Sequence, residues 1–174
     1  MLENYNIPFA SLKYGNYLYD YLIEHPFFEM FEYSPITEGR VWVNLLLSKQ
    51  SSSLLLLNFT IKGTVEVQCD RCLEKFDFPL EGKNKLLVKL DDTLGEESEE
   101  IIVISKKEDE LNIAQYIYEF INLLIPFKVV HPEDENGHSR CNKKILAVLK
   151  KLHPKPHKKN VVDPRWETLK KLYP

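Results

Sequence analysis

The sequence lacks the residue patterns from which common catalytic loops are built. Its six glycines stand singly along the chain, so no Gly-rich phosphate-binding loop is present. Neither the Gly-x-Ser-x-Gly turn of hydrolases nor the His-Glu-x-x-His helix of metalloproteases occurs. These absences exclude the commonest recognisable active sites, and we expect a protein that is not an enzyme.

Long apolar runs are also missing. The most hydrophobic stretch, LLLLNFTI (54–61), is far shorter than the roughly 20 residues that a membrane-spanning helix needs. The N-terminal residues have no basic stretch followed by an apolar one, so no signal peptide is predicted. We therefore expect a cytoplasmic protein with reduced thiols. Its three cysteines, an odd number, cannot all pair within one chain.

Composition and charge indicate a globular body with a basic end. With 44% hydrophobic and 28% charged residues in 174, the chain suits one domain, or one domain with an appendage. The net charge of −3 is unevenly distributed, because residues 140–174 carry eleven basic and two acidic side chains. This segment therefore has a charge of +9 and residues 1–139 have −12. We expect an acidic body (1–139) and a basic helical segment (140–174) that meets a polyanion or folds back on the body.

The hydrophobic pattern changes from strands to helices along the chain. Period-two alternation predicts strands over 16–24, 39–49, 51–69, 75–82, 84–90 and 100–105. Within the third of these, Gly63 is expected to mark a bulge or a bend. Strands followed by helices are typical of the α+β class. We expect an antiparallel sheet or a partly open, barrel-like β block, followed by C-terminal helices.

Three helices are predicted after the strands. The first covers 111–126, with Asn112 or Asp109 as its cap and Pro126 at its end. The second is a short, basic, amphipathic helix over 142–152, and the third is DPRWETLKKL (163–172).

Two cysteines, Cys69 and Cys72, lie in the tight turn CDRC between two predicted strands. Thiolates at this spacing can bind one tetrahedral zinc ion, which needs two further ligands in a closed structural site. Cys141 ends a loop that also contains His131 and His138. A Cys3His site is therefore available, with either histidine as its fourth ligand.

Other roles for the CDRC turn remain open. Cys69 and Cys72 can also be unliganded, reduced thiols that pack at the end of a strand. A redox pair is less favoured, because such pairs begin a helix in a βαβ setting, whereas the flanks here read as strands. Asp70, between the cysteines, has the chemistry of an acid or a base, but we expect it to orient the turn by accepting backbone N–H bonds.

Several of these segments together resemble a known family. GTVEVQCDRCLEKFDFPLEG, the helix in AQYIYEFINLLIPFKVVHP, a downstream cysteine and DPRWETLKKL are similar to the YceD family of large ribosomal RNA subunit accumulation proteins. The resemblance covers roughly 36–172. It implies a role in the accumulation or processing of large-subunit ribosomal RNA, and so in ribosome assembly. It also implies that His131 and Cys141 stand where the family has its second ligand pair, which favours His131 over His138 in a structural zinc site.

A basic C-terminal surface is the predicted contact for ribosomal RNA. Its cations are Arg140, Lys143, Lys144, Lys150, Lys151, Lys155, Lys158, Lys159 and Arg165. Trp166 can stack on an unpaired base, or it can be buried against the body or a partner. In the alternative hypothesis the chain is a protein-interaction module: its acidic body binds a basic ribosomal protein, and 163–172 docks in a partner's groove. Neither reading involves a membrane or a small-molecule substrate.

Overall fold

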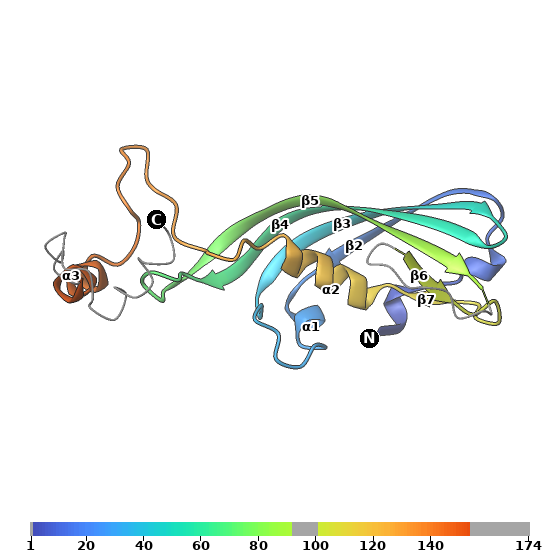
Figure 1. Cartoon of the computed structure of the whole chain (residues 1–174), viewed down its shortest axis with the longest axis horizontal. Coiled ribbons are helices and arrows are strands. Elements are labelled where there is room, and N and C mark those ends of the chain that lie inside the picture. Colours follow the sequence, from blue (N-terminus) through green and yellow to red (C-terminus); the bar gives the residue numbers. More distant parts are fainter. Residues whose placement is uncertain (1, 92–100, 154–174) are drawn as a thin grey trace, which may run out of the picture.

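A computed structural model describes residues 2–91 and 101–153, in which a five-stranded sheet carries helices on one face (Figure 1). The strands, in spatial order, are β2 (Gly15–Ile23), β3 (Gly39–Ser51), β4 (Leu54–Gln68), β5 (Lys75–Leu90) and β6 (Ile101–Ile104). Neighbouring strands are antiparallel from β2 to β5, whereas β6 runs parallel to β5. The predicted α+β class is confirmed, with an open antiparallel sheet to which one parallel strand is added.

The smaller elements, apart from the last helix, which lies beside the hairpin tip, cover one face of the sheet (Figure 1). They are the 3-10 helices η1 (Leu2–Tyr5) and η2 (Phe9–Ser11), the paired strands β1 (Asn6–Ile7) and β7 (Leu111–Asn112), and the helices α1 (His25–Phe28), α2 (Ala114–Leu123) and α3 (Lys143–Leu152). None of the helices in the described part of the chain is long and apolar enough to span a bilayer. The predicted helix at 163–172 lies outside the described residues.

Helix α2 is shorter than the sequence predicts. It begins at Ala114, because Leu111 and Asn112 pair with the N-terminal strand β1 instead of starting the helix. The Asn112 side chain still accepts a bond from the Ala114 N–H at 3.0 Å, although the N-cap position itself is Ile113. The sequence could not reveal this, since the partner strand comes from the other end of the chain.

The two faces of the sheet differ in burial. Along β3, Val41, Val43, Leu45 and Leu47 are buried and belong to the core cluster that also contains buried residues of α1 and α2. Residues between them in the sequence point to the opposite face, where Trp42 is 49% exposed. Burial of one apolar face therefore fixes the register of the sheet.

Gly63 does not form the bulge that its position predicts. It pairs with Val41 on β3 and Leu80 on β5 without a shift in register, and the irregularity in β3 lies between Lys49 and Ser51. A Cβ atom at position 63 would collide with the carbonyl oxygen of Arg40. Glycine is thus needed here for the close approach of two backbones.

Strands β4 and β5 extend beyond the rest of the sheet. Strand β3 begins at Gly39, opposite Val65, so the last residues of β4 and the first of β5 pair only with each other. They form a two-stranded hairpin that projects from one end of the molecule (Figure 1). After α2 the chain runs back along this hairpin and ends the described part in α3 beside its tip.

Candidate metal centre

The CDRC turn forms the tip of the β4–β5 hairpin. The Cys69 N–H donates to the Glu74 carbonyl at 2.9 Å, and the Leu73 N–H donates to the Cys69 carbonyl at 2.8 Å. Leu73 takes a left-handed conformation with φ 62°, which reverses the chain. This tight reversal places both thiols at the same side of the tip, where they are fully buried.

Asp70 joins the turn to the segment that follows α2. Its N–H donates to the Val129 carbonyl at 2.8 Å, and its carboxylate accepts from the Val129 N–H at 2.5 Å. The expected bond from Asp70 to its own turn is replaced by this pair of bonds across the two segments. Asp70 therefore holds the returning chain against the hairpin, just before His131.

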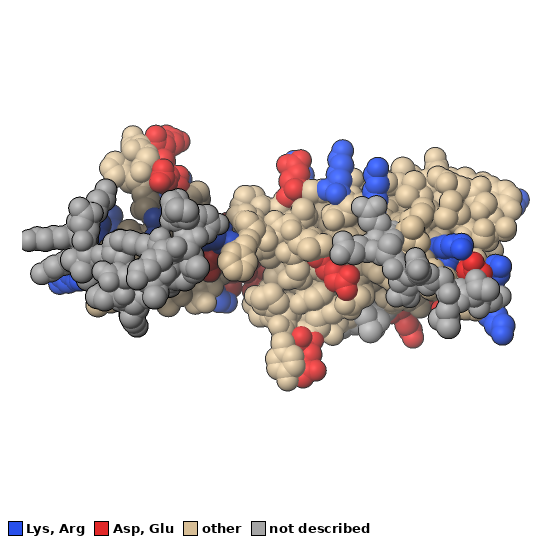
Figure 2. Space-filling view, viewed as in Figure 1, with Lys and Arg blue, Asp and Glu red and all other residues tan. Residues whose placement is uncertain are grey.

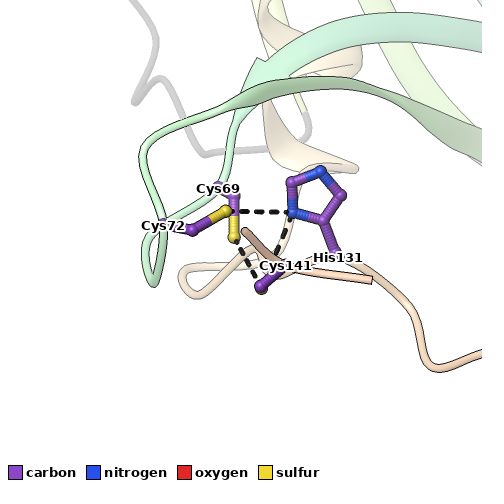
Figure 3. Close-up of side chains that lie close together, drawn as sticks. All are labelled: Cys69, Cys72, His131 and Cys141. Carbon is purple, nitrogen blue, oxygen red and sulfur yellow. Dashed lines mark hydrogen bonds between the residues drawn. The ribbon is translucent and has the colours of Figure 1, made fainter. Parts of the chain in front are cut away.

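Four side chains converge at this junction (Figure 3). The ligand atoms of Cys69, Cys72, His131 and Cys141 all lie within 4.8 Å of one another, and this cluster could hold a metal ion. The Sγ atoms of Cys69 and Cys141 are 3.7 Å apart. His131 Nδ1 is 3.4 Å from Cys72 Sγ and 3.7 Å from Cys141 Sγ.

The spacing matches a tetrahedral metal site. A zinc ion with ordinary Zn–S and Zn–N bonds separates its ligand atoms by about 3.5–3.8 Å. Three of the six separations between ligand atoms, 3.4–3.7 Å, fall close to this range, and all six are within 4.8 Å. All three cysteines are free thiols, so no disulfide competes for them.

The two candidate histidines lie in different surroundings. His131 enters the cluster, and its ring stacks on Phe76 of β5 with centroids 4.4 Å apart. Its pKa is raised, chiefly by a bond to the Cys69 thiol. His138 remains exposed in the loop, with Nδ1 3.6 Å from the Asp134 carboxylate. The structure thus brings His131 and not His138 to the cysteines.

Hydrogen bonds set the charge of the thiols. Burial raises the pKa of Cys69, but N–H groups of the turn and bonds from His131 outweigh it and lower the pKa to about 6. Burial also raises the pKa of Cys141, where bonds from Ser139 and Arg71 prevail and the pKa is lowered. At Cys72 burial dominates and the pKa is raised. Cys69 and Cys141 therefore lose their protons more readily than ordinary thiols, and the thiolate is the form that binds metal.

Arg71 is a neighbour of the cluster that the sequence patterns did not single out. Its Nε donates to Cys141 Sγ at 3.2 Å, and its terminal Nη2 donates to Ser139 Oγ at 2.5 Å. A site of three thiolates and one neutral imidazole around Zn²⁺ carries a net charge of −1, which the guanidinium offsets. The sequence did offer one indication of this role, since Arg71 lies between the two cysteines of CDRC.

Helix α3 begins directly at the cluster. Asn142, next to Cys141, accepts a bond from the Lys144 N–H at 2.9 Å and donates to Glu74 at 2.7 Å. Ile145 and Leu146 pack against the three cysteines. The cluster therefore fixes the position where the basic helix starts.

Only some of the cations predicted to contact RNA lie in the described part of the chain. Arg140, Lys143, Lys144, Lys150 and Lys151 are exposed on and before α3, and no carboxylate of the described residues forms an ion pair with them. Lys155, Lys158, Lys159, Arg165 and Trp166 lie outside the described residues.

Comparison with known proteins covers the whole of this site. A family model described as large ribosomal RNA subunit accumulation protein YceD matches residues 57–173. An uncharacterized protein of Bacillus subtilis (strain 168), YlbN, is 31% identical over 126 residues, which are 72% of this chain and 67% of the relative. No solved structure matches the chain.

Proposed function

The chain belongs to the YceD family of large ribosomal RNA subunit accumulation proteins, and on that premise we propose that it is a non-enzymatic ribosome-assembly factor. In this role it supports the accumulation or processing of large-subunit ribosomal RNA in the cytoplasm. The observation that carries the proposal is the cluster at the hairpin tip, from which an exposed basic helix begins. In this proposal the cluster has a structural role: it positions the binding surface and catalyses no reaction.

The proposed cofactor is a structural zinc ion held by Cys69, Cys72, His131 and Cys141. Three sulfurs and one imidazole nitrogen are a common zinc donor set, and four protein ligands leave no open position for substrate. When bound, the ion replaces the protons of the thiols and ties the hairpin to the start of α3. Its role is then to fix geometry, as in other closed zinc sites.

The proposed contact with ribosomal RNA is the basic segment 140–174, whose described part is α3. Lys143 and Lys144 lie in the first turn of α3, and Lys150 and Lys151 lie in its last. Because no carboxylate in the described part of the chain pairs with them, these lysines can neutralise phosphates and release the counterions condensed on RNA. Residues 1–139 carry a net charge of −12, so long-range attraction to RNA is strongest at the basic segment.

The metal content of anaerobically purified protein tests the cofactor. We expect stoichiometric zinc in the wild-type chain and its loss in a Cys69→Ser, Cys72→Ser variant. A His138→Ala variant is the matched control, because His138 lies outside the cluster, and it should keep its zinc. Wild-type protein without stoichiometric zinc would contradict the proposal.

Filter binding to large-subunit ribosomal RNA at rising salt tests the contact. Lys150→Gln, Lys151→Gln should weaken binding and reduce the slope of log K against log salt by about 0.7–0.9 for each phosphate that is no longer neutralised. The control, Lys13→Gln, Lys107→Gln, removes two exposed lysines that lie outside α3. Equal binding by the α3 variant and the wild type would overturn this contact.

A second candidate function is a protein-interaction module. It is favoured by two exposed apolar side chains near the end of α2, Leu123 at 73% and Phe127 fully exposed. Pull-down from nuclease-treated lysate, repeated with purified basic ribosomal proteins, separates the two functions. Binding that survives nuclease and is lost in Phe127→Ser favours the protein partner.

A further inference from the structure

The face of the sheet turned away from α1 and α2 forms a second surface with nucleic-acid-binding chemistry. We call it the outer face (Figure 1). Paired residues of β3, β4 and β5 form four successive rows across it. These rows are Arg40–Thr64–Pro79, Trp42–Lys62–Glu81, Asn44–Thr60–Lys83 and Leu46–Asn58–Lys85.

Trp42 is the aromatic side chain of these rows. It is 49% exposed, whereas Val41 and Val43 beside it are 0% and 1% exposed. Trp42 therefore does not fill the core of the sheet, and about half of its large side chain is exposed to water. An indole ring held on a rigid strand is a flat surface on which an unpaired base can stack.

A shallow depression lies next to Trp42. Thr64 and Pro79 form its floor as short side chains between the longer Arg40, Lys62 and Glu81. Its volume is about 620 Å³, which lies within the range of small-ligand sites. A base stacked on Trp42 thus has room for its sugar beside the ring.

Beyond Glu81, two lysines of β5 in the last two rows supply positive charge for a phosphate backbone. Lys83 and Lys85 are exposed, and within 2–91 and 101–153 no carboxylate forms an ion pair with either. Lys62 contacts Glu81 only at 3.9 Å, between two exposed side chains, so it remains available to phosphate. Figure 2 shows basic side chains projecting on the side of the molecule away from α1.

The residue types favour RNA over a protein partner. The cores of protein interfaces are depleted in lysine, whereas here lysines occupy three successive rows, the first of which is the row of Trp42. Thr60, Thr64 and Asn58 add neutral groups that can bond to base edges. The bases of a duplex are already stacked and cannot reach Trp42, so the suitable strand is single.

We propose that the outer face binds single-stranded RNA, with a base stacked on Trp42 and phosphates beside Lys62, Lys83 and Lys85. The proposal rests on the function proposed above and adds to it a surface separate from α3. Unpaired segments of large-subunit RNA are the class of ligand that it fits.

Tryptophan fluorescence tests this directly, because the chain has only two tryptophans. In full-length Trp166→Phe, Trp42 is the single reporter. We expect an oligo(A) RNA of about 10 nucleotides to quench its fluorescence, and the same strand paired with oligo(U) to leave it unchanged. Trp42→Ala should weaken binding of oligo(A) about tenfold, and Trp42→Phe should retain most of it. Tyr33→Ala, which removes an aromatic ring that is 91% exposed elsewhere, should bind as the wild type.

The outcomes separate this proposal from the role of α3. If ribosomal RNA still binds in the filter assay but Trp42 fluorescence does not change, the outer face is not a site and the function proposed above stands. If oligo(A) quenches Trp42 while the α3 lysine variant binds normally, the outer face is the contact and the α3 surface is not. If Trp42→Ala lowers only the binding of a purified ribosomal protein, the face docks protein and this proposal is overturned.

Discussion

Arg71 is the residue that connects the charge of the cluster to its geometry. It stands between the two cysteines of the turn and donates to the third, Cys141, from the other side of the site. Partners of metal ligands commonly set their orientation and basicity. In this protein the same guanidinium also bonds Ser139, whose hydroxyl accepts from the Cys141 N–H at 3.2 Å. One cation thereby holds the ligand and its loop together.

Arg71→Gln is expected to weaken zinc binding by about tenfold or more, because it removes the charge that offsets the thiolates and the bond that orients Cys141. Competition with a chromophoric chelator measures the change. Arg140→Gln removes a neighbouring exposed arginine that makes no sulfur contact, and it should leave the affinity unchanged. Equal affinities in the two variants would show that Arg71 has no influence on the metal.

Gly63→Ala is expected to destabilise the sheet by about 2–3 kcal/mol, since the added methyl group meets backbone of β3 that cannot move aside. Gly82→Ala is the matched control. The added methyl group there meets the side chain of Leu124, which can rotate away. Urea unfolding of both variants measures the two decreases in stability. A larger decrease for Gly82→Ala would contradict the close approach at Gly63.

At the scale of elements, the hairpin tip and α3 stabilise each other through Asn142. Its side chain caps the helix and also reaches Glu74 beyond the CDRC turn. We expect Asn142→Ala to lower the stability of α3 by about 1 kcal/mol and Asn142→Ser to restore most of that stability, because serine is also a good cap. Hydrogen exchange of the α3 amides measures both. Identical exchange in the two variants would exclude a capping role.

The strands were largely predictable because alternation is a local signal. Strand β5 shows the limit: its sequence predicts two strands, 75–82 and 84–90, yet it is one strand, Lys75–Leu90. Pro79 is tolerated because β6 pairs only with the far end of β5, from Leu87 onward, so the proline lies at an edge of the sheet. The parallel direction of β6 likewise depends on tertiary packing that no local pattern records.

The candidate site was predictable only where its signal is local in the sequence. The spacing of Cys69 and Cys72 is local, and it identified the turn without help from the fold. The choice between His131 and His138 is made by the Asp70–Val129 bonds, which join distant segments. The outer face, with Trp42, was not predicted. Alternation in a strand shows that its two faces differ, but only the folded sheet shows which face the helices cover.

At the scale of the whole molecule, the tip and the sheet have separate cores. The cysteines pack with Phe76, Val130, Ile145 and Leu146, apart from the main cluster between the sheet and α2. The two clusters are joined by the edge contact of Phe76 with Phe78, and they share no buried residue among those described. We therefore expect the tip to depend on its ligands more than on the body. Loss of the metal should therefore act locally.

Removal of zinc by a chelator is expected to raise hydrogen exchange in the CDRC turn, the segment 127–142 and α3. The amides of β2, β3 and the central part of β4 should stay protected, because their core is independent of the cluster. Hydrogen exchange read by mass spectrometry, before and after chelation, gives both results. Loss of protection throughout the sheet would contradict the division into two cores. Re-addition of zinc serves as the control and should restore the tip.

The order of the ligands along the chain also sets when the site can form during synthesis. A ribosome has made all of β2, β3, β4 and β5, and with them Cys69 and Cys72, before it reaches His131 and Cys141. A nascent chain that stops between residues 90 and 131 contains β2 to β5, but it has only two of the four candidate ligands, Cys69 and Cys72. Capture of the proposed metal is therefore expected to be a late event, which requires that translation has passed residue 141.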